Sequence, residues 1–452
     1  MKQNKKVTTP IVDFIKAYSE SDTTRFHMPG HKGKSFLGCE AFDITEIHGA
    51  DSLYEADSII AESEENATQL FGSACTLFST EGSSQCIRAM LYLTMLLKKD
   101  GTRPVIVAAR NVHKAFIYAA ALLDFDVVWL WPEEHAESIC SCYVSAETIE
   151  KVLKEYADSV VAVYVTSPDY LGGQDDIRLI SEVCHKYKTI LAVDNAHGAY
   201  LHFLEPSQHP LDLGADICCD SAHKTLPVLT GGAYLHISKN APEIFVRQAK
   251  YAMGLFGSTS PSYLIMASMD ACNQYLADGY QKRLRETLVM IDTFCSKVGN
   301  QGWKFRKSDP LKITIEIPSG ISSKELTKQL RDHKIECEYA DPDFLVFMVT
   351  PENTMDDLEK LAEALGKNCF QYKNKEHMPL EKVTQMLTIR EAMFSEPESI
   401  FVADSCGRIC RVPTVSCPPA IPIAVPGELI DGTMLKLFQY YGIEKLDVVK
   451  ER

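Results

Sequence analysis

Residues 216–237, DICCDSAHKTLPVLTGGAYLHI, contain a lysine whose surroundings could make it a nucleophile. Two short apolar runs flank Ser221-Ala222-His223-Lys224 and a Gly231-Gly232 pair, a pattern that predicts two strands with a tight connection between them. We therefore expect Lys224 on that connection and not on a solvated helix face. A lysine in a dry pocket can lose its proton and attack a carbonyl as a free amine. An ordinary turn lysine is the alternative.

A second chemical feature is a turn of small residues that precedes a helix. The apolar run 76–78 breaks at 80–84, TEGSS, and continues as a long helix with an apolar face. Backbone N–H groups, hydroxyls and the positive end of the helix dipole make such a turn suitable for an anion such as phosphate. A serine that only caps the helix is the alternative. The turn 257–260, GSTS, opens another apolar helix in a similar way.

Further polar residues follow other apolar runs. Asp194 follows 189–193, TILAV, and would end a buried strand. A buried carboxylate is costly unless a cation or N–H groups neutralise it, so Asp194 needs a partner. A structural helix cap would also explain it. His113 stands after the run 104–108, and His197 stands three residues after Asp194. An imidazole at such a position could stack on a flat ring.

The elements that must position these residues alternate between strand and helix. Apolar runs at 104–108, 126–131, 160–166 and 189–193 indicate strands, and 175–187 indicates one of the intervening helices. Near-continuous apolar strands predict a mostly parallel sheet covered on both faces. Functional residues gather at the carboxyl ends of the strands in such sheets. The candidates at those ends are Ser83, Ser84, His113, Ser167, Asp194 and His197.

The remaining segments predict the rest of the organisation. Helices are expected at 8–24, 56–72, 242–253 and 281–299, and short strands with helices at 323–333 and 354–367 indicate a smaller α+β domain. We expect a polar linker at 371–379, a helix at 380–395, and a rigid extended run at 417–428 that places Glu428 near the start of a last helix. The predicted parts are an N-terminal helix and loop (1–65), a large domain (66–300), a small domain (301–372) and a C-terminal segment (373–452).

The composition is that of a globular protein and excludes several functions. Hydrophobic residues make up 46% and charged residues 24% of the 452 residues. The 46 Lys+Arg against 61 Asp+Glu, a net charge of −15, argue against a nucleic-acid partner and mildly favour a cationic substrate. No signal peptide and no membrane span is expected. The 15 cysteines lack zinc-ligand spacing, which predicts buried free thiols in a reducing cytoplasm and no metal site.

One cofactor would satisfy these groups together. Pyridoxal 5′-phosphate (PLP) has an aldehyde for Lys224, a phosphate for the two serine-rich turns and Ser221, and a ring nitrogen that stays protonated against a carboxylate such as Asp194. His113 could stack on its ring. This cofactor supplies an electron sink to reactions at the α-carbon of amino acids.

The order of these motifs resembles that of the bacterial ornithine/lysine/arginine decarboxylases, PLP enzymes of the aspartate-aminotransferase fold. The resemblance covers about residues 8–435 and implies the fold-type I architecture of PLP-dependent transferases, a mostly parallel seven-stranded α/β sheet flanked by helices, with a smaller α+β C-terminal region. The motifs that carry it are GSS (82–84), His113, DNAH (194–197), SAHK (221–224), STSP (258–261), HMPGHKG (27–33), TSPDYLGG (166–173) and PPAIPIAVPGE (418–428).

The resemblance also implies a role for each matching residue. Lys224 would carry PLP as a Schiff base, and Asp194 would face the pyridine nitrogen. The implied catalytic residues are Lys224, His223, His197 and His113. The implied cofactor-binding residues are Lys224, Asp194, His113, Gly82, Ser83, Ser84, Ser221, His223, Ser258 and Thr259. His31 and Glu428 are the implied substrate residues, with Glu428 on the distal cationic group.

Ser258 or Thr259 would reach the phosphate in a second subunit, which implies a homodimer with shared active sites. Two features depart from the family pattern: Cys417-Pro418-Pro419-Ala420 stands where an aromatic–Pro–Pro–Gly run is usual, and Gly82-Ser83-Ser84 replaces Gly-Thr-Ser or Gly-Ser-Thr. The chain resembles the short biosynthetic form, without the receiver-like N-terminal domain of the long enzymes.

The resemblance predicts a cytoplasmic decarboxylase of the polyamine pathway that converts arginine, lysine or ornithine to agmatine, cadaverine or putrescine. The sequence does not choose among these substrates. A PLP-dependent aminotransferase or β/γ-lyase on the same fold is the main alternative, since fold alone does not determine the reaction. In an aminotransferase, Arg408 or Arg411 could hold the substrate carboxylate. A non-catalytic protein that kept the fold is a third possibility.

Overall fold

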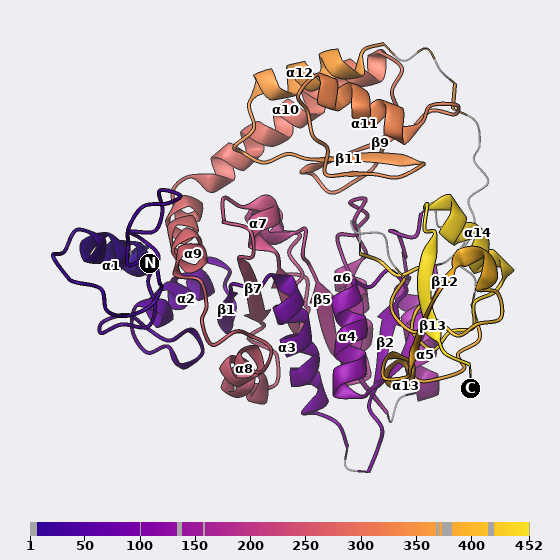
Figure 1. Cartoon of the computed structure of the whole chain (residues 1–452), viewed down its shortest axis with the longest axis horizontal. Helices are drawn as coiled ribbons and strands as arrows, with labels where there is room; N and C mark the ends of the chain where they lie inside the picture. The colour runs from indigo at the N-terminus through magenta and orange to yellow at the C-terminus, as the bar shows by residue number, and fades with distance from the viewer. Residues whose placement is uncertain are drawn as a thin grey trace. The chain divides into compact units, whose positions relative to one another are not determined.

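The structure is a computed structural model that describes residues 7–99, 101–132, 138–156, 159–367, 369, 371–372, 382–414 and 420–451. The chain divides into two compact units. Their helices and strands are labelled in Figure 1. The first consists of Met1–Leu96 and Ile190–Arg283, and the second of Leu97–Thr189 and Leu284–Arg452. Each unit contributes strands to the main sheet.

The first unit packs helices against one part of that sheet. Strand β7 is antiparallel to both β1 and β6, whereas β5 and β6 are parallel. The short connection between β6 and β7 accounts for their antiparallel pairing, because a parallel pair needs a long crossover. The elements are α1 Pro10–Ser19, η1 Leu53–Glu55, α2 Ile59–Leu70, β1 Cys75–Ser79, α3 Ser83–Met95, β5 Ile190–Asp194, η2 Ala199–Phe203, β6 Ile217–Asp220, α7 Ala222–Thr225, β7 Ala233–Ile237, α8 Glu243–Leu255 and α9 Tyr263–Ala277.

The second unit holds the other strands of the main sheet, a small antiparallel sheet and the C-terminal region. Strand β2 is parallel to both β3 and β4. The four-stranded sheet has the order β10-β11-β9-β8, and β12 pairs with β13. The elements are β2 Val105–Ala109, α4 Lys114–Leu123, β3 Asp126–Leu130, α5 Ala146–Tyr156, β4 Val160–Thr166, α6 Ile177–Lys186, β8 Phe305–Arg306, β9 Lys312–Glu316, α11 Ser323–Asp332, β10 Tyr339–Ala340, β11 Phe344–Met348, α12 Met355–Leu365, α13 Ile389–Met393, β12 Pro397–Phe401, η3 Val402–Asp404, α14 Gly432–Tyr440 and β13 Lys445–Val449; α10 Tyr280–Asn300 begins in the first unit.

The main sheet has seven strands in the order β1-β7-β6-β5-β4-β2-β3. The predicted mostly parallel α/β architecture is therefore confirmed, with β7 as its antiparallel strand. The strands other than the edge strand β3, which is mostly half-buried, are buried, as expected for a sheet covered by helices on both faces. The division of the chain into four parts at 65, 300 and 372 stays a prediction.

Two predicted helices differ from the structure. The helix expected at 8–24 is shorter, because α1 ends at Ser19, before the Ser- and Asp-rich stretch that favours helix less. Of the helix expected at 380–395, the described residues contain only the short α13, Ile389–Met393. Gln385 forms a bridge with Glu428, and Thr388 caps the short α13 through a capping box with Glu391. The predicted linker at 371–379 lies mostly outside the described residues.

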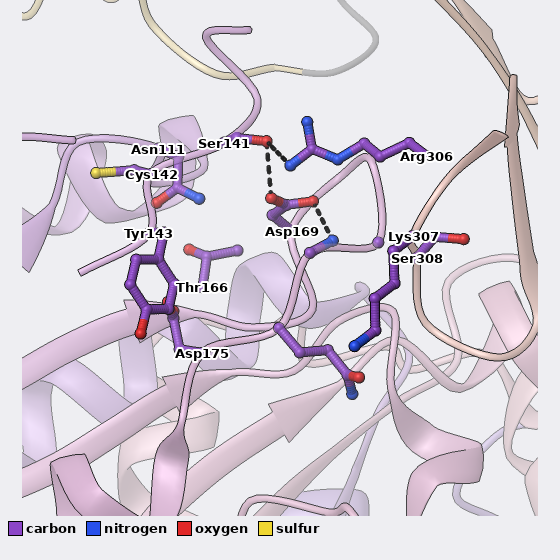
Figure 2. A pocket seen from close by; sticks show the side chains of 13 residues that line it. Asn111, Ser141, Cys142, Tyr143, Thr166, Asp169, Asp175, Arg306, Lys307 and Ser308 are labelled. Atoms are coloured by element: carbon purple, nitrogen blue, oxygen red, sulfur yellow. Dashed lines mark hydrogen bonds between the residues drawn. The ribbon is translucent and has the colours of Figure 1, made fainter. Parts of the chain in front are cut away.

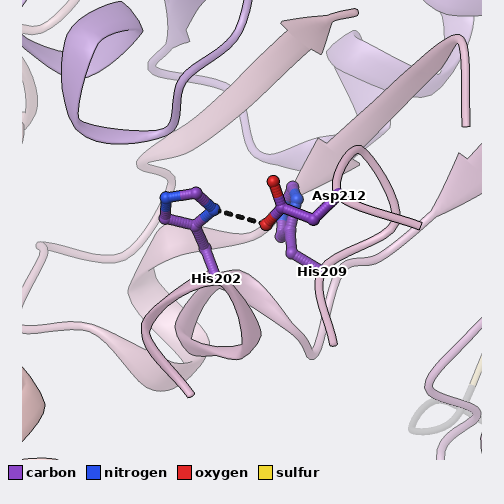
Figure 3. Close-up of side chains that lie close together, drawn as sticks. All are labelled: His202, His209 and Asp212. Carbon is purple, nitrogen blue, oxygen red and sulfur yellow. Dashed lines mark hydrogen bonds and ion pairs between the residues drawn. The ribbon is translucent and has the colours of Figure 1, made fainter. Parts of the chain in front are cut away.

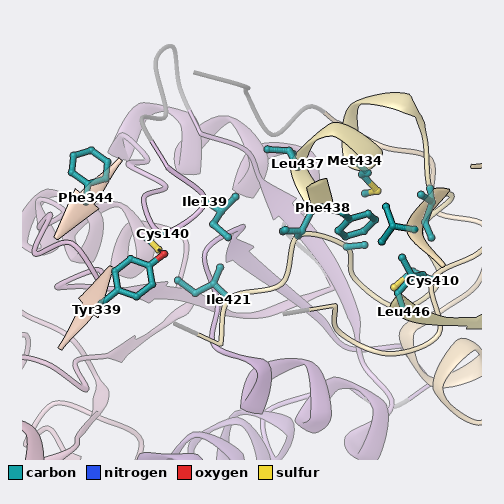
Figure 4. Packing of buried hydrophobic residues seen from close by; sticks show 14 of the residues in the cluster. Ile139, Cys140, Tyr339, Phe344, Cys410, Ile421, Met434, Leu437, Phe438 and Leu446 are labelled. Carbon is teal, nitrogen blue, oxygen red and sulfur yellow. Dashed lines mark hydrogen bonds between the residues drawn. The ribbon is translucent and has the colours of Figure 1, made fainter. Parts of the chain in front are cut away.

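The C-terminal region is held by an apolar cluster of the second unit (Figure 4). Ile423, Phe438 and Val448 are each fully buried in it, and they pack with Ile139 from the segment after β3. Burial of side chains of this size stabilises a fold by roughly 1.5–3 kcal/mol each. The cluster therefore fixes the course of 420–451 within its unit, including the run that contains Glu428.

None of the helices within the described ranges is long and apolar enough to cross a membrane. The 14 cysteines that the structure describes are free thiols, and most are buried. Burial raises the pKa of several of them, for example that of Cys75 to about 11. Buried thiols of this kind behave as small apolar side chains.

Candidate active site

Lys224 lies between β6 and β7, as predicted, but the connection contains one helical turn, α7. The Lys224 side chain is partly exposed, and its Nζ lies 3.1 Å from Nε2 of His197. A histidine at this distance can exchange a proton with the lysine. The pair therefore joins a potential amine nucleophile to a potential base.

Asp194 is the last residue of β5 and is only 2% exposed. Its Oδ1 accepts a hydrogen bond from the Ala196 N–H at 3.2 Å and one from the Cys219 thiol at 3.7 Å. The next helical element, η2, has Gly198 as its N-cap, so the helix-cap explanation of Asp194 is wrong. Both of these contacts come from neutral groups, and a buried carboxylate is stabilised further by a positive charge beside it.

The turn 80–84 leads directly into α3. Gly82 is the N-cap, with φ 72°, and no side chain caps the helix, so the alternative of a serine that only caps the helix is wrong. Ser83 begins the helix, and its Oγ accepts a hydrogen bond of 2.8 Å from Oγ of Ser221. Two hydroxyls from separate strand ends thus meet at the N-terminus of a 13-residue helix. This is the arrangement that favours binding of an anion.

The glycine pair after α7 lets this turn approach the β6–β7 connection closely. The Gly82 N–H donates to the Gly231 carbonyl at 2.7 Å. Gly231 has φ +101°, and a Cβ on it would lie 2.8 Å from the Thr80 carbonyl oxygen. Only glycine fits there without a shift of the backbone. The candidate anion turn and the lysine connection are therefore held together.

His223 is oriented by Gly232. Its backbone N–H donates to the Gly232 carbonyl at 3.2 Å, and its Nδ1 lies 3.0 Å from the same oxygen. Because a carbonyl only accepts, Nδ1 carries a proton, and Nε2 is the acceptor of the neutral ring. The residue before Lys224 is therefore a histidine whose neutral ring has a defined tautomer.

Ser258 and Thr259 are exposed in the turn before α9. The Ser258 N–H donates to the Glu81 carboxylate of the same chain, and its Oγ accepts from the Ser260 N–H at 3.1 Å. The turn is therefore attached to the residue before Gly82. A contact of Ser258 or Thr259 with a second subunit stays a prediction.

A buried network behind these residues is absent from the sequence-based prediction. The Asp220 carboxylate, which is fully buried, accepts from Asn195 Nδ2 at 2.7 Å and contacts Nε2 of His209 and of His236 at 3.1 Å each. Burial alone would raise the pKa of Asp220, but His209 and His236 outweigh it and hold this pKa well below its usual range. The network fixes Asn195, the residue after Asp194. One signal was available: His236 interrupts the apolar strand AYLHI.

His209 also lies near His202 and Asp212 (Figure 3). Nδ1 of His202 and Oδ2 of Asp212 are 2.7 Å apart, and Asp212 also accepts from the Ser207 hydroxyl. These hydrogen bonds, together with the contact of His209 to Asp220, account for the cluster. We assign no metal to it.

His113 belongs to the second unit, where it is the N-cap of α4. Its Nδ1 accepts from the Ala115 N–H at 3.1 Å, which fixes the orientation of the ring. The next residue, Lys114, donates its N–H to the Ala420 carbonyl at 3.0 Å. Ala420 of the C-terminal segment therefore lies close to His113. A role of His113 in ring stacking stays a prediction.

Glu428 lies in a buried ion pair of the same unit. Its Oε2 is 3.0 Å from Nη2 of Arg110, and it also accepts from the Val425 N–H at 2.7 Å. Burial raises the pKa of Glu428 more than Arg110 lowers it. Arg110 in turn donates to the carbonyls of Pro422 and Ile423. A substrate cation at Glu428 would have to share this carboxylate with Arg110, and the substrate role stays a prediction.

Glu428 lies near the start of the last helix, as predicted. Helix α14 starts at Gly432, and Asp431 is its N-cap. Ala420, where the family pattern has glycine, adopts φ +61°. This left-handed conformation costs an alanine roughly 1 kcal/mol relative to glycine. The departure at this position is therefore accommodated at some cost in stability.

His31 is held in the N-terminal loop of the first unit. Its Nε2 lies 3.2 Å from Oδ2 of Asp43, and its Nδ1 accepts from the Gly33 N–H at 3.0 Å. Both ring nitrogens thus have partners within the loop. Its predicted contact with a substrate stays a prediction.

Comparison with known proteins identifies a family. A family model described as "Orn/Lys/Arg decarboxylase, major domain" matches residues 9–316. The arginine decarboxylase of Bacillus subtilis (strain 168) is 28% identical over 456 residues, which cover 93% of this chain and 91% of that protein. The lysine decarboxylase LdcA of Pseudomonas aeruginosa is 24% identical over 284 residues, 55% of this chain and 37% of that protein.

Solved structures show the same fold. The lysine decarboxylase LdcF of Francisella novicida superposes with a TM-score of 0.81 at 19% identity, and the alignment covers 98% of this chain and 81% of that one. The predicted fold-type I architecture is thereby confirmed. Since the family model spans more than half of the sequence, the chain belongs to the Orn/Lys/Arg decarboxylase family.

Proposed function

We propose that the protein is a PLP-dependent decarboxylase that releases CO2 from a basic amino acid and leaves the corresponding amine. The observation that carries the proposal is the presence in one unit of Lys224 with His197 at 3.1 Å, the buried Asp194 and the Ser83–Ser221 hydroxyl pair. Family membership and relatives named arginine and lysine decarboxylases support it.

The residues fit PLP in three respects. Asp194 is a buried carboxylate that a protonated ring nitrogen would neutralise. Ser83, Ser84 and Ser221 stand where a helix N-terminus would hold the phosphate, with Gly82 allowing close approach of the backbone. Lys224 has an amine for the aldehyde. These assignments form the cofactor part of the proposal.

Bound PLP supplies an electron sink for the bond that breaks when CO2 leaves. Lys224 binds the cofactor, and His197 can take the proton from its Nζ and so keep the amine nucleophilic. Asp194 would stabilise a positive charge on the ring nitrogen. Lys224 Nζ or His197 Nε2 then returns a proton to the substrate Cα. Asp220 is a positioning residue here, because it acts through Asn195 and touches none of the reacting groups.

An aminotransferase is less well supported by the arginines named for it. Arg408 Nη2 contacts the Glu398 carboxylate and donates to the Val449 carbonyl at 3.1 Å. Arg411 donates to the carbonyls of Ser395 and Met393 at 2.9 and 3.0 Å. Both guanidinium groups are thus used to hold the C-terminal region, which removes the reason for placing either on a substrate carboxylate.

Two further parts of the proposal concern the context of the enzyme. A homodimer with Ser258 or Thr259 at the partner's phosphate is supported by the exposure of both residues. A cytoplasmic location is supported by the free thiols, since oxidising compartments favour disulfides.

A substrate panel tests the reaction. Purified protein with PLP should release CO2 from at least one of arginine, lysine and ornithine, with one equivalent of agmatine, cadaverine or putrescine. A parallel assay with a keto acid should show no amino transfer. Amino transfer without CO2 would favour the aminotransferase, and neither reaction, together with no yellow cofactor-bound protein, would favour a non-catalytic protein.

A second test concerns the phosphate. Ser83→Ala and Ser221→Ala should each weaken PLP binding by about 10- to 100-fold, because a hydrogen bond to a charged group contributes roughly 1.5–3 kcal/mol. Equilibrium dialysis would measure the Kd. Ser322→Ala, which removes an exposed serine without a capping bond, is the control. An unchanged Kd in both variants would show that the two hydroxyls only hydrogen-bond to each other and do not bind the phosphate.

A further inference from the structure

The second unit contains a cavity of about 400 Å³ to which the proposed mechanism assigns no role (Figure 2). Its walls come from the end of β2, the segment after β3, the loop after β4 and the turn after β8. All of its lining residues belong to this unit. Its volume is in the range of small-molecule pockets.

The hydrogen-bonding groups on one wall of the cavity already have partners within the protein. Asp169 accepts from the N–H groups of Leu171 and Gly173 at 2.8 and 2.7 Å and from the Ser141 hydroxyl at 2.9 Å. Arg306 donates to the same hydroxyl at 3.0 Å, and Figure 2 shows the bonds of the Ser141 hydroxyl to Arg306 and Asp169 along one side of the cavity. Asp169 therefore has a structural role in this wall, and we do not assign it to ligand binding.

Three other acceptors line the cavity. Asn111 is 2% exposed, and its Oδ1 has no hydrogen-bond donor among the residues that the structure describes; the same holds for the buried Oγ1 of Thr166. The third is the carboxyl of Asp175. Burial and the charge of Asp169 raise the pKa of Asp175 to about 8, and only the Val144 N–H opposes them. The cavity thus presents acceptors that a donor would complete.

We propose that this cavity binds a small organic cation, with Asp175 as its counter-charge and Asn111 and Thr166 as hydrogen-bond acceptors. A guanidinium has five N–H donors and an ammonium has three, so either could satisfy these groups together. A neutral or anionic ligand would add no positive charge beside the Asp175 carboxylate, whose burial is costly without compensation.

The cation could come from two sources, the side chain of the substrate or a separate amine that regulates the enzyme. The first source rests on the proposed function, and binding itself does not. The experiment therefore measures binding before it measures turnover.

Calorimetry on the full-length protein, without substrate, would use butylguanidine as the cation and butylurea as its neutral isostere. Butylguanidine should bind at least about tenfold more tightly than butylurea, because only the cation has a charge for Asp175. Asp175→Asn, which retains an acceptor for the Val144 N–H, and Asn111→Leu should each weaken butylguanidine binding about tenfold or more. Asp292→Asn, which removes an exposed carboxylate on α10, should leave it unchanged. Equal binding of the two probes, or unchanged binding in Asp175→Asn, would overturn the proposal.

The wild-type protein provides a second test that needs no variant. The other titratable groups that line the cavity with Asp175 are Asp169, Arg306, Lys307 and Tyr143, together with Cys142, whose pKa burial raises to about 12. A cation binds the ionised form of Asp175, so affinity should rise with pH towards 8 and then level off. Since butylguanidine stays charged, its Kd at pH 6 should be about a hundredfold weaker than at pH 9. A flat profile would contradict the assignment of Asp175.

Steady-state kinetics then identify the source. If the cavity receives the substrate side chain, butylguanidine inhibits competitively and Asp175→Asn raises KM with little change in kcat. If it receives a separate amine, inhibition or activation is not competitive. Either outcome supports the site. If no basic amino acid is decarboxylated, the proposed function fails while the calorimetric result still decides this inference.

Discussion

Replacement of Lys224 by alanine is expected to abolish covalent attachment of PLP and to lower kcat/KM for decarboxylation by at least about 10³-fold. Lys224 follows β6, and its Nζ lies 3.1 Å from Nε2 of His197. The variant keeps the pocket but loses the amine that binds the aldehyde. Absorbance near ~420 nm and mass spectrometry after borohydride reduction would follow the attachment.

The matched control is Lys239→Ala, which removes an exposed lysine of the turn after β7. It should retain wild-type absorbance and turnover. Thermal unfolding of both variants would show that the fold persists. Activity of Lys224→Ala within tenfold of the wild type would sink the assignment of Lys224.

Asp194→Asn is expected to lower kcat by about 100-fold or more at saturating PLP. The asparagine keeps an acceptor for the Ala196 N–H but loses the charge, and loss of one partner of a buried ion pair costs about 3 kcal/mol. Turnover should be measured with the cofactor content determined in the same sample. This separates weak binding from a weakened electron sink.

Asp194→Glu is the conservative comparison, because it keeps the negative charge and only displaces it. It should recover part of the lost rate, which a purely structural role of the Ala196 contact would not predict. Full turnover of Asp194→Asn with a full complement of PLP would rule out the assigned role of Asp194.

The sequence by itself determined the elements that carry the candidate site. Apolar runs bounded by small and turn-forming residues encode both a strand and the place where it ends, so the amino-acid pattern alone was enough to place Asp194 and Lys224 at strand ends. The Gly82-Ser83-Ser84 turn before a helix could be located in the same way. Family motifs then added a chemical role to each position. These signals are local, because periodicity and turn residues act over a few neighbouring positions.

Only the tertiary structure decided which buried charges are paired. Arg110 meets Glu428 across 318 residues, and Asp220 contacts His209, His236 and Asn195 from three other segments. No local pattern selects such partners, since the packing of distant elements determines where a carboxylate is buried. The same reason explains why the helix expected at 380–395 is only the short α13 among the described residues: Gln385, which precedes it, forms a bridge with Glu428. It also explains why the acceptors of Asn111, Thr166 and Asp175 are found around one cavity only in the folded chain.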